Sequence, residues 1–190
     1  MGWRGLQPPP SPEDQSAMPE TPEALLARLE GLGIQAITYQ HPPLHTVSES
    51  KRLRGDLPGL HVKNLFLRAR PPHPFLLVVA EEDLPLSINA LARRLDAGRL
   101  SMASEAELWE RLGVRPGSVT PFALVNAPPG SVRLVMDSRL LEGPGPVNLH
   151  PLTNTATTAV APGDLRRFLE SLGHPPVALD LTAVPTEPLA

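Results

Sequence analysis

The sequence predicts an α+β domain built on a mixed, largely antiparallel β-sheet. The predicted strands and helices follow one another in an order that is not a regular strand–helix–strand repeat. The 25 prolines disfavour an all-helical bundle, because proline removes a backbone donor from a helix interior. A hydrophobic fraction of 41% over 190 residues is enough for one core, and aromatic residues at 4% leave aliphatic side chains to fill most of it.

The first half of the chain predicts three helices and three strands. Thr21-Pro22-Glu23 begins a helix, because it combines a capping hydroxyl, a proline at the first helical position and an acid in the first turn. The box Thr46-Val47-Ser48-Glu49 predicts a helix over 46–54, and Ser87 caps a helix that runs through Asp96. Apolar runs bounded by Gly, Pro or Asn predict strands at 36–40, 62–69 and 75–80.

The second half predicts two helices and three strands. Ser104-Glu105-Ala106-Glu107 matches a capping box and predicts a helix over 104–112. A last helix is expected from Asp164 to Leu172, ended by Gly173. Strands are expected at 122–126, 132–136 and 155–160.

The domain is expected to occupy residues 21–176. Residues 1–20 are polar and rich in proline, and this composition indicates a disordered leader. Residues 177–190 form a C-terminal tail with a similar composition. Val177, Leu179 and Leu181 alternate there, so the tail is expected to dock as a strand.

Composition excludes several classes of function. The absence of cysteine removes disulfides, thiolate zinc sites and cysteine nucleophiles, and fits a cytoplasmic location. No apolar run approaches the ~20 residues of a membrane span, so no membrane partner is expected. His41 and His45 have the spacing of a helical zinc pair, but Pro42 and Pro43 forbid that helix. No metal site is therefore expected.

The choice of basic residues singles out one lysine. Of the 17 basic residues, only Lys51 and Lys63 are lysine, and all the others are arginine. Lys63 lies in the apolar run Val62-Lys63-Asn64-Leu65-Phe66-Leu67, where a compact ammonium differs from the planar guanidinium fork. The alternative is an ordinary strand lysine whose head reaches solvent over Leu65 and Leu67.

Two polar loops are the other candidate site segments. In Gly117-Ser118-Val119-Thr120-Pro121, a glycine and small polar residues can expose backbone N–H groups to an anion or a carbonyl oxygen. The segment His150-Pro151-Leu152-Thr153-Asn154-Thr155-Ala156-Thr157 combines an imidazole, an amide and three hydroxyls. The structural alternatives are a simple turn for the first loop, and a loop cap with an exposed strand face for the second.

These segments together resemble the YbaK/prolyl-tRNA synthetase editing-domain family, and most of all its freestanding members that hydrolyse alanyl-tRNA(Pro). The resemblance runs from about Thr21 to Pro176 and rests on the order and spacing of several motifs. They are Tyr39-Gln40-His41-Pro42-Pro43, Val62 to Leu67, Leu100-Ser101-Met102-Ala103-Ser104-Glu105, Leu112-Gly113-Val114, Pro116 to Phe122 and His150 to Thr157.

The resemblance implies a partly closed sheet surrounded by helices, with no metal or cofactor. It implies that the lysine of the Lys63-Asn64 pair is the residue whose loss is most damaging, and it maps the family's two loop motifs onto Gly117–Pro121 and His150–Ala156. On this basis the expected catalytic residues are Lys63, Gly117 and His150. The expected substrate-binding residues are Asn64, Ser118, Val119, Thr120, Pro121, Asn154, Lys51, Arg52 and Arg54.

The expected partner is the acceptor end of tRNA(Pro), with prolyl-tRNA synthetase as a further candidate and the oligomeric state left open. A net charge of −3 gives no global attraction to RNA, so a local patch is needed. Lys51-Arg52-Leu53-Arg54 is the densest basic cluster, with a solvated helix end as its alternative. The competing functions are a deacylase for Cys-tRNA(Pro) or another small mischarged amino acid, and a non-catalytic module that binds tRNA or the synthetase.

Overall fold

The computed structural model describes residues 18–43, 57–72 and 75–184. Its helices are α1 (Pro22–Gly31), α3 (Ile88–Arg94), α4 (Glu105–Leu112), α5 (Ser138–Glu142) and α6 (Pro162–Ser171), with the 3₁₀ helices η2 (Pro121–Asn126) and η3 (Leu181–Ala183). Its strands are β1 (Ala36–Gln40), β2 (Leu60–Arg68), β3 (Phe75–Glu81), β4 (Ser101–Met102), β5 (Arg133–Asp137), β6 (Val147–Leu149), β7 (Ala156–Val160) and β8 (Val177–Leu179).

The strands form one mixed sheet in the order β1-β7-β6-β2-β3-β5-β8, with β4 paired to β2 off this path. The ladders β1–β7, β6–β7, β2–β3 and β2–β4 are antiparallel, whereas β2–β6, β3–β5 and β5–β8 are parallel. The predicted α+β class with a mixed, largely antiparallel sheet is confirmed. The path ends at β1 and β8, so the sheet does not close into a barrel.

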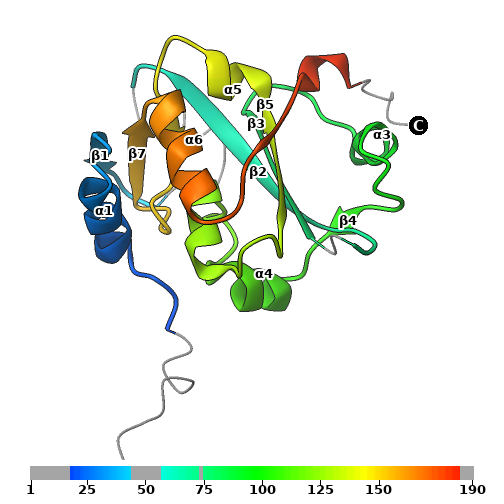
Figure 1. Ribbon diagram of the computed structural model, residues 1–190, viewed down its shortest axis with the longest axis horizontal. Helices are drawn as coiled ribbons and strands as arrows, with labels where there is room; N and C mark the ends of the chain where they lie inside the picture. The colour runs from blue at the N-terminus through cyan, green and yellow to red at the C-terminus, as the bar shows by residue number, and fades with distance from the viewer. Residues whose placement is uncertain (1–17, 44–56, 73–74, 185–190) are drawn as a thin grey trace, which may run out of the picture.

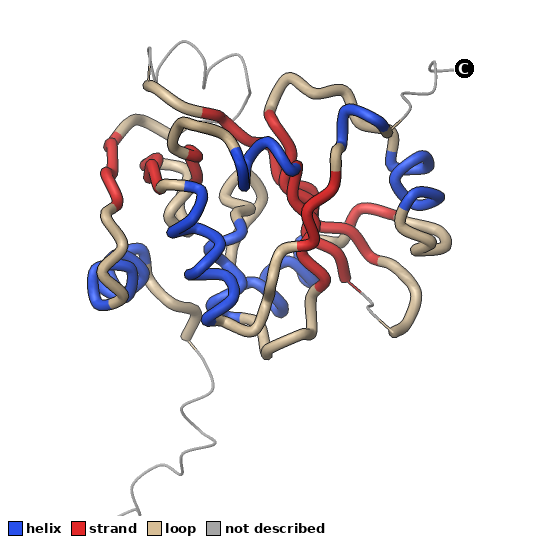
Figure 2. Tube along the Cα trace, turned by 45° about the horizontal axis from the view of Figure 1, so that its top comes forward, coloured by secondary structure: helices blue, strands red, loops and turns tan. Residues whose placement is uncertain are grey.

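Helices cover both faces of the central strands (Figure 1), and each face carries its own hydrophobic cluster. The first cluster contains Phe66, Leu77 and Val79 of the sheet, together with buried residues of α1, α4 and α6. The second contains Leu67, Leu76 and Val78 and packs against α3. Figure 2 shows the same layering, with α6 and α3 on opposite sides of the crossing strands.

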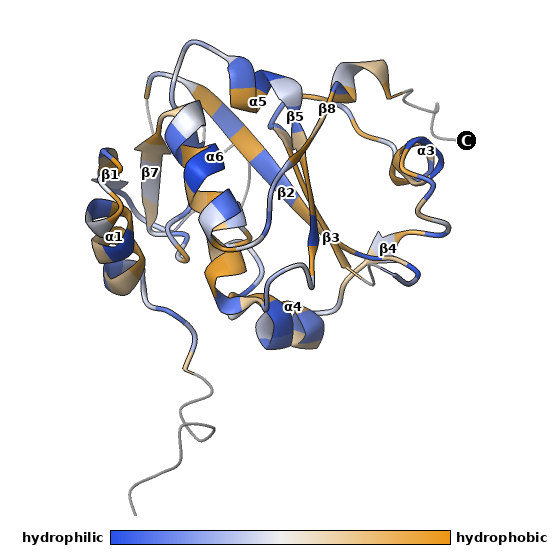
Figure 3. Ribbon diagram, in the orientation of Figure 1, coloured by the Kyte–Doolittle hydropathy of each residue, from blue (hydrophilic) through white to orange (hydrophobic). Residues whose placement is uncertain are grey.

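Two strands differ in how they are buried. The hydropathy colouring in Figure 3 alternates along β2, whereas β3 is hydrophobic for most of its length. β3 lies between β2 and β5 and is buried from Phe75 to Ala80, as expected for a strand with packed faces on both sides. β2 is only half-buried along its first six residues, which include Lys63.

The helix starts agree with the capping residues in the sequence. Thr21 caps α1 and Ser87 caps α3 through side-chain oxygens that accept backbone N–H groups. The Ser104 and Glu107 side chains form the complete capping box of α4. α6 begins at Pro162, two residues before the predicted start, because proline suits the first turn of a helix. Among the described residues, none of the helices has both the length and the apolarity needed to cross a bilayer.

The predicted strand at 122–126 is wrong, because these residues belong to η2. Pro121 occupies the first turn, and the Thr120 hydroxyl accepts the Phe122 N–H, so the chain turns where an extended strand was expected. Phe122, Ala123 and Leu124 are completely buried. A short apolar run buried on all sides has no periodicity that separates helix from strand.

Residues just outside both predicted boundaries of the domain, 21 and 176, contact the rest of the fold. The Glu20 backbone N–H donates to the Asn126 side chain at 2.8 Å, and Glu20 also pairs with Arg28. These contacts begin before residue 21. At the other end, β8 pairs with β5, as the alternation of Val177 and Leu179 predicted. The helix expected at 46–54 and residues 1–17 and 185–190 lie outside the described residues.

Candidate active site

The candidate site lies along one edge of β2, at the residues between the segment that pairs with β6 and the segment that pairs with β4. On the same edge of β2, β6 pairs with Leu60 and His61, and β4 pairs with Leu67 and Arg68. Between these ladders, within the described part of the chain, no strand pairs with this edge at Lys63 and Asn64. An unpaired strand edge presents backbone donors and acceptors to whatever lies beside it.

Lys63 and Asn64 point to opposite faces of β2, because successive side chains alternate along a strand. Val62 and Phe66 belong to the cluster beneath α6, so Asn64 lies on that face. Leu65 and Leu67 belong to the cluster beneath α3, so Lys63 lies on the other face. The two neighbouring residues can therefore contact different parts of one ligand that passes the unpaired edge.

The Lys63 ammonium is half-buried and already held in place. It donates to the backbone carbonyl oxygen of Leu84, just after β3. Burial lowers the pKa of Lys63 from its ordinary value, and the attraction of Glu81 and Asp83 only partly opposes that shift. An ammonium has three donors, so the bond to Leu84 leaves two for a ligand. This arrangement differs from a lysine whose head simply extends into solvent.

Asn64 joins β2 to the loop Gly117–Pro121. Its Nδ2 donates to the Val119 carbonyl oxygen at 2.9 Å. Its Oδ1 is buried and has no hydrogen-bond partner among the described residues. A buried amide oxygen without a partner is unfavourable by about 1–3 kcal/mol, so this acceptor is suited to a donor that a ligand supplies.

The backbone of the Gly117–Pro121 loop provides donors at two positions. Gly117 has φ +86°, in the left-handed region that favours glycine. The Ser118 N–H donates to the Arg115 carbonyl oxygen at 3.0 Å, whereas the Gly117, Val119 and Thr120 N–H groups have no acceptor among the described residues. Thr120 is fully buried, so Gly117 and Val119 carry the loop amides that remain for a ligand.

The rest of this loop is buried and supports the exposed part. Ser118 is 8% exposed and Thr120 is fully buried. Thr120 and Pro121 form the start of η2, and the Thr120 hydroxyl accepts a backbone N–H there. Two of the expected substrate-binding residues, Thr120 and Pro121, are therefore buried and anchor the loop to η2.

The His150–Thr157 loop lies beside the Gly117 loop. The Asn154 Nδ2 is 3.7 Å from the position that a Cβ on Gly117 would occupy. Leu152 has φ +65°, which is unfavourable for a leucine, and its side chain packs against the first core cluster. A non-glycine residue in this conformation has to be held by its surroundings, as loops at functional sites often are.

His150 lies on the Lys63 side of the sheet. Val147 and Leu149 point into the first core cluster, so alternation directs His150, the next residue after β6, to the other face. Its Nδ1 is 3.1 Å from the Ala156 carbonyl oxygen. That carbonyl can only accept, so Nδ1 carries the proton and Nε2 of the neutral ring is an acceptor.

His41 and Thr157 extend this polar cluster, and sequence reasoning did not assign either to the site. The His41 Nδ1 donates to the Pro42 carbonyl oxygen at 2.9 Å, so its Nε2 accepts from the Thr157 hydroxyl, also at 2.9 Å. The His41 and His150 rings are 6.4 Å apart between centroids. The signal available in the sequence was the Tyr39-Gln40-His41-Pro42-Pro43 motif, which carried the family resemblance without a role for His41.

Three expected site residues are not placed. Lys51, Arg52 and Arg54 lie outside the described residues. Within the described ranges, no group of three or more His, Cys, Asp or Glu side chains is arranged to hold a metal ion. Direct contacts join Asn64 to Val119 and place Asn154 beside Gly117. Strand alternation puts Lys63 and His150 on the face of the sheet opposite to Asn64.

A family model described as the aminoacyl-tRNA editing domain matches residues 41–168. This range includes every residue of the candidate site. It begins at His41 and ends within α6.

Named relatives match most of the chain. A Danio rerio protein named "prolyl-tRNA synthetase associated domain-containing protein 1" is 41% identical over 152 residues, which cover 80% of this chain and 82% of that protein. The Acetoanaerobium sticklandii "prolyl-tRNA editing protein ProX" is 31% identical over 159 residues, covering 84% and 96%. A solved structure, "hypothetical protein APE2540", aligns with a TM-score of 0.62 and 24% identity over 81% of this chain and 97% of that one, a likeness of fold.

Proposed function

The chain belongs to the aminoacyl-tRNA editing domain family, and from that membership we propose that it is a trans-editing deacylase for alanine wrongly attached to tRNA(Pro). The observation that carries the proposal is the edge of β2 at Lys63 and Asn64, which has no strand partner within the described part of the chain. There Lys63 and Asn64 lie on opposite faces of β2, the Asn64 amide oxygen has no partner among the described residues, and the Gly117–Pro121 loop is bonded to Asn64. Such a set of groups suits an ester that joins an amino acid to a ribose.

Each group has a counterpart in the ester. Lys63 would hold the ribose–phosphate end of the acceptor strand, since an ammonium is a point charge suited to phosphate. The Gly117 and Val119 N–H groups would bind the ester carbonyl oxygen and stabilise the negative charge that develops on it. The Asn64 Oδ1 would accept from the α-ammonium group of alanine. The first two roles follow the family motifs, and the third follows from the missing partner of the amide.

The reaction needs no nucleophile from the protein. Water attacks the ester carbonyl carbon, and the bond from that carbon to the ribose oxygen breaks as the tetrahedral intermediate collapses. The water proton passes to the ribose oxygen, so the products are alanine and tRNA with a free terminal hydroxyl. The His150 Nε2, an acceptor in the neutral ring, would order the water, and the ribose vicinal hydroxyl is an alternative source of assistance.

Alanine is the proposed substrate because a proline pocket cannot strongly reject a smaller amino acid. The absence of a methylene changes binding by only ~1–3 kcal/mol, which is too little for faithful charging. A second site that admits alanine and excludes proline supplies the rest. The acceptor end of tRNA(Pro) would be the partner in this role, with prolyl-tRNA synthetase as a further one in the cytoplasm.

The test is release of labelled amino acid from Ala-tRNA(Pro), Cys-tRNA(Pro), Pro-tRNA(Pro) and Ala-tRNA(Ala) by the wild-type protein. Rapid loss of alanine from tRNA(Pro) alone is the expected result. Cleavage of the cysteine ester instead would assign the protein to the related deacylase activity. No hydrolysis of any ester would contradict the enzyme and leave a module that binds tRNA or the synthetase.

A further inference from the structure

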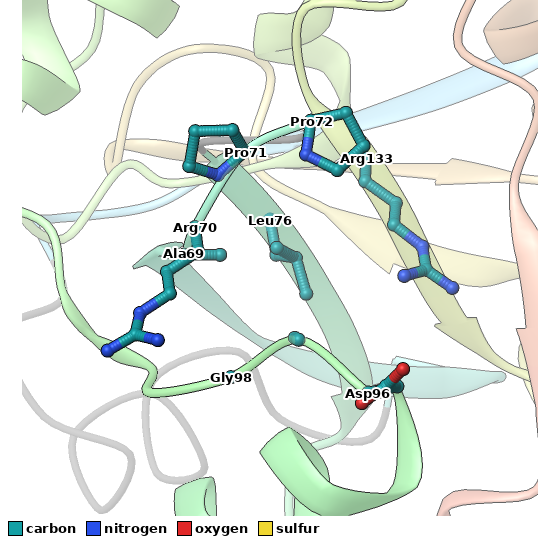
Figure 4. Close-up of a pocket in the computed structure, with 9 residues that line it drawn as sticks. Ala69, Arg70, Pro71, Pro72, Leu76, Asp96, Gly98 and Arg133 are labelled. Carbon is teal, nitrogen blue, oxygen red and sulfur yellow. The ribbon is translucent and has the colours of Figure 1, made fainter.

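A pocket of about 280 Å³ lies at the other end of the β2–β3 hairpin from the candidate site. Leu76 lies at the centre of its apolar floor. Arg70, just after β2, and Arg133, the first residue of β5, also line it. Figure 4 shows Arg70 and Arg133 extending on two sides of Leu76, with Pro71 and Pro72 above and Asp96 below. None of its lining residues belongs to the candidate active site.

The pocket and Lys63 share one face of the sheet. Arg133 pairs with Leu76 in the β3–β5 ladder, and Leu76 pairs with Leu67 in the β2–β3 ladder. Directly paired residues point to the same face, so Arg133, Leu67 and Lys63 all lie on the α3 side. Ala69 is six residues beyond Lys63, a separation of about 20 Å at ~3.3 Å per residue. The arginines therefore lie on the same side of the sheet as the proposed reaction centre, about 20 Å away from it.

The charges around the pocket are mostly positive. Arg70 has no ion pair among the residues described here, and its aliphatic part packs within 3.2 Å of the position of a Cβ on Gly98. Within the described ranges, Arg133 donates once, to the Leu95 carbonyl oxygen at 3.4 Å, which leaves most of its five N–H groups for other acceptors. Arg94 and Arg99 are exposed on either side of the Asp96–Gly98 segment that lines the pocket.

We propose that this arginine pocket binds the phosphodiester backbone of the substrate RNA, outside the site that holds the aminoacyl end. The chain as a whole carries a net charge of −3, so attraction of RNA has to come from a local concentration of cations such as this one. Guanidinium groups match phosphate oxygens in pairs, and the apolar floor beside them suits a ribose or a base. Asp96 can accept from a ribose hydroxyl or a base amino group.

The proposal rests on the proposed function for its choice of RNA, and it adds a second contact to it. With the aminoacyl end beside Lys63, the same RNA molecule must continue about 20 Å further along the α3 face to reach the pocket. Binding there contributes affinity and orientation without touching the ester. The arginines should consequently affect a full tRNA and leave a short ester substrate unaffected.

The experiment compares wild type with Arg70→Gln/Arg133→Gln and with Arg70→Gln alone, which leaves the Arg133–Leu95 bond in place. Arg167→Gln is the matched control, because Arg167 is on α6, over the opposite face of the sheet. The first readout is the dissociation constant for uncharged tRNA(Pro) at several salt concentrations, which requires no hydrolysis. We expect the double variant to bind about tenfold more weakly, as loss of a charge-assisted contact predicts, with a salt slope smaller by about one or two.

The second readout is hydrolysis of Ala-tRNA(Pro) and of alanine esterified to adenosine alone. The double variant should have a lower kcat/KM for the tRNA and an unchanged rate for the short ester. An unchanged dissociation constant and salt slope would overturn the proposal, even if both esters are hydrolysed. Weaker binding of uncharged tRNA supports it even if no ester is hydrolysed, so failure of the proposed function is a separate outcome. Unchanged tRNA binding with loss of binding to purified prolyl-tRNA synthetase would assign the pocket to a protein and contradict an RNA contact.

Discussion

The Asn64 side chain donates through Nδ2 to the Val119 carbonyl oxygen at 2.9 Å, and this bond joins β2 to the loop that begins at Gly117. The same amide presents a buried oxygen that has no partner in the described part of the chain. One residue thereby holds the loop against β2 and keeps an acceptor beside it. The site depends on this contact between two segments that are 55 residues apart in the sequence.

Replacement of Asn64 should reduce both stability and turnover. Asn64→Ala removes the bond to Val119 and should lower the free energy of unfolding by about 1 kcal/mol. Asn64→Asp should be worse, because a carboxylate placed against a carbonyl oxygen has no donor to offer. Denaturant unfolding and kcat/KM on Ala-tRNA(Pro) measure the two effects. Asn89→Ala, at an exposed position of α3, is the control, and an Asn64→Ala protein as active and stable as that control would refute the role.

Gly117→Ala should impair the loop even though there is space for the methyl group. The nearest atom to an added Cβ is 3.7 Å away, an ordinary contact, but φ is +86°. An L-residue in the left-handed region is unfavourable by about 1–2 kcal/mol, so the loop should lose stability or shift its N–H groups, with a lower kcat/KM. Gly163→Ala is the matched comparison, since it has open space, no positive φ and a helical position. It should be neutral or stabilising by up to about 1 kcal/mol, and equal effects of the two substitutions would contradict the argument.

The lowered pKa of Lys63 gives the stability a definite dependence on pH. Burial lowers the pKa in the folded protein, so between that value and about 10.4, the usual value for lysine, the unfolded chain binds more protons than the folded one. The free energy of unfolding should therefore rise with pH in that window, relative to a Lys63→Met variant. Urea unfolding of both proteins at pH 7 and near pH 10 measures the difference. A difference that is constant, or that shrinks as pH rises, would show that the lysine is not desolvated.

His174 should matter for the fold and not for the chemistry. Its ring is 2% exposed, and its nitrogens lie 3.1 Å from the Val132 carbonyl oxygen and 3.3 Å from that of Ala127. His174→Ala leaves these carbonyls buried without the ring and creates a cavity, so it should lower the free energy of unfolding by about 2–4 kcal/mol. The activity per folded molecule should be that of wild type. Calorimetry together with an active-fraction measurement tests this, and a stable but inactive variant would be the contrary result.

The parts of the fold that the sequence predicted were those with local signals. Thr21, Ser87 and Ser104 are capping residues whose hydrogen bonds involve neighbours within three residues, so their helices could be recognised without the tertiary structure. β4, β6 and α5 have only two, three and five residues, too short for a periodic pattern, and they were missed. The run at 122–126 was read as a strand because its burial on all sides hides its period.

The site shows the same division between local and long-range information. The two loops and the Lys63-Asn64 pair stand out in the sequence, but their arrangement around an unpaired edge of β2 depends on which strands become neighbours. The alternation along β2 that separates Lys63 from Asn64 was foreseeable, whereas the Leu84 partner of the lysine was not, since it comes from a turn 21 residues away. The arginine pocket likewise combines Arg70 and Arg133 from distant segments.

Single-turnover hydrolysis of Ala-tRNA(Pro) by wild type, Lys63→Ala and Lys63→Arg tests the central claim most directly. Arg167→Gln, on the opposite face, serves as the control. Loss of the ammonium should slow hydrolysis by about 100-fold or more, as removal of one preorganised electrostatic contact does, with the fold intact. Lys63→Arg should restore little, because the guanidinium does not fit the place of a compact ammonium. Hydrolysis by Lys63→Ala at the wild-type rate would contradict a reaction centre beside Lys63 and Asn64 on β2.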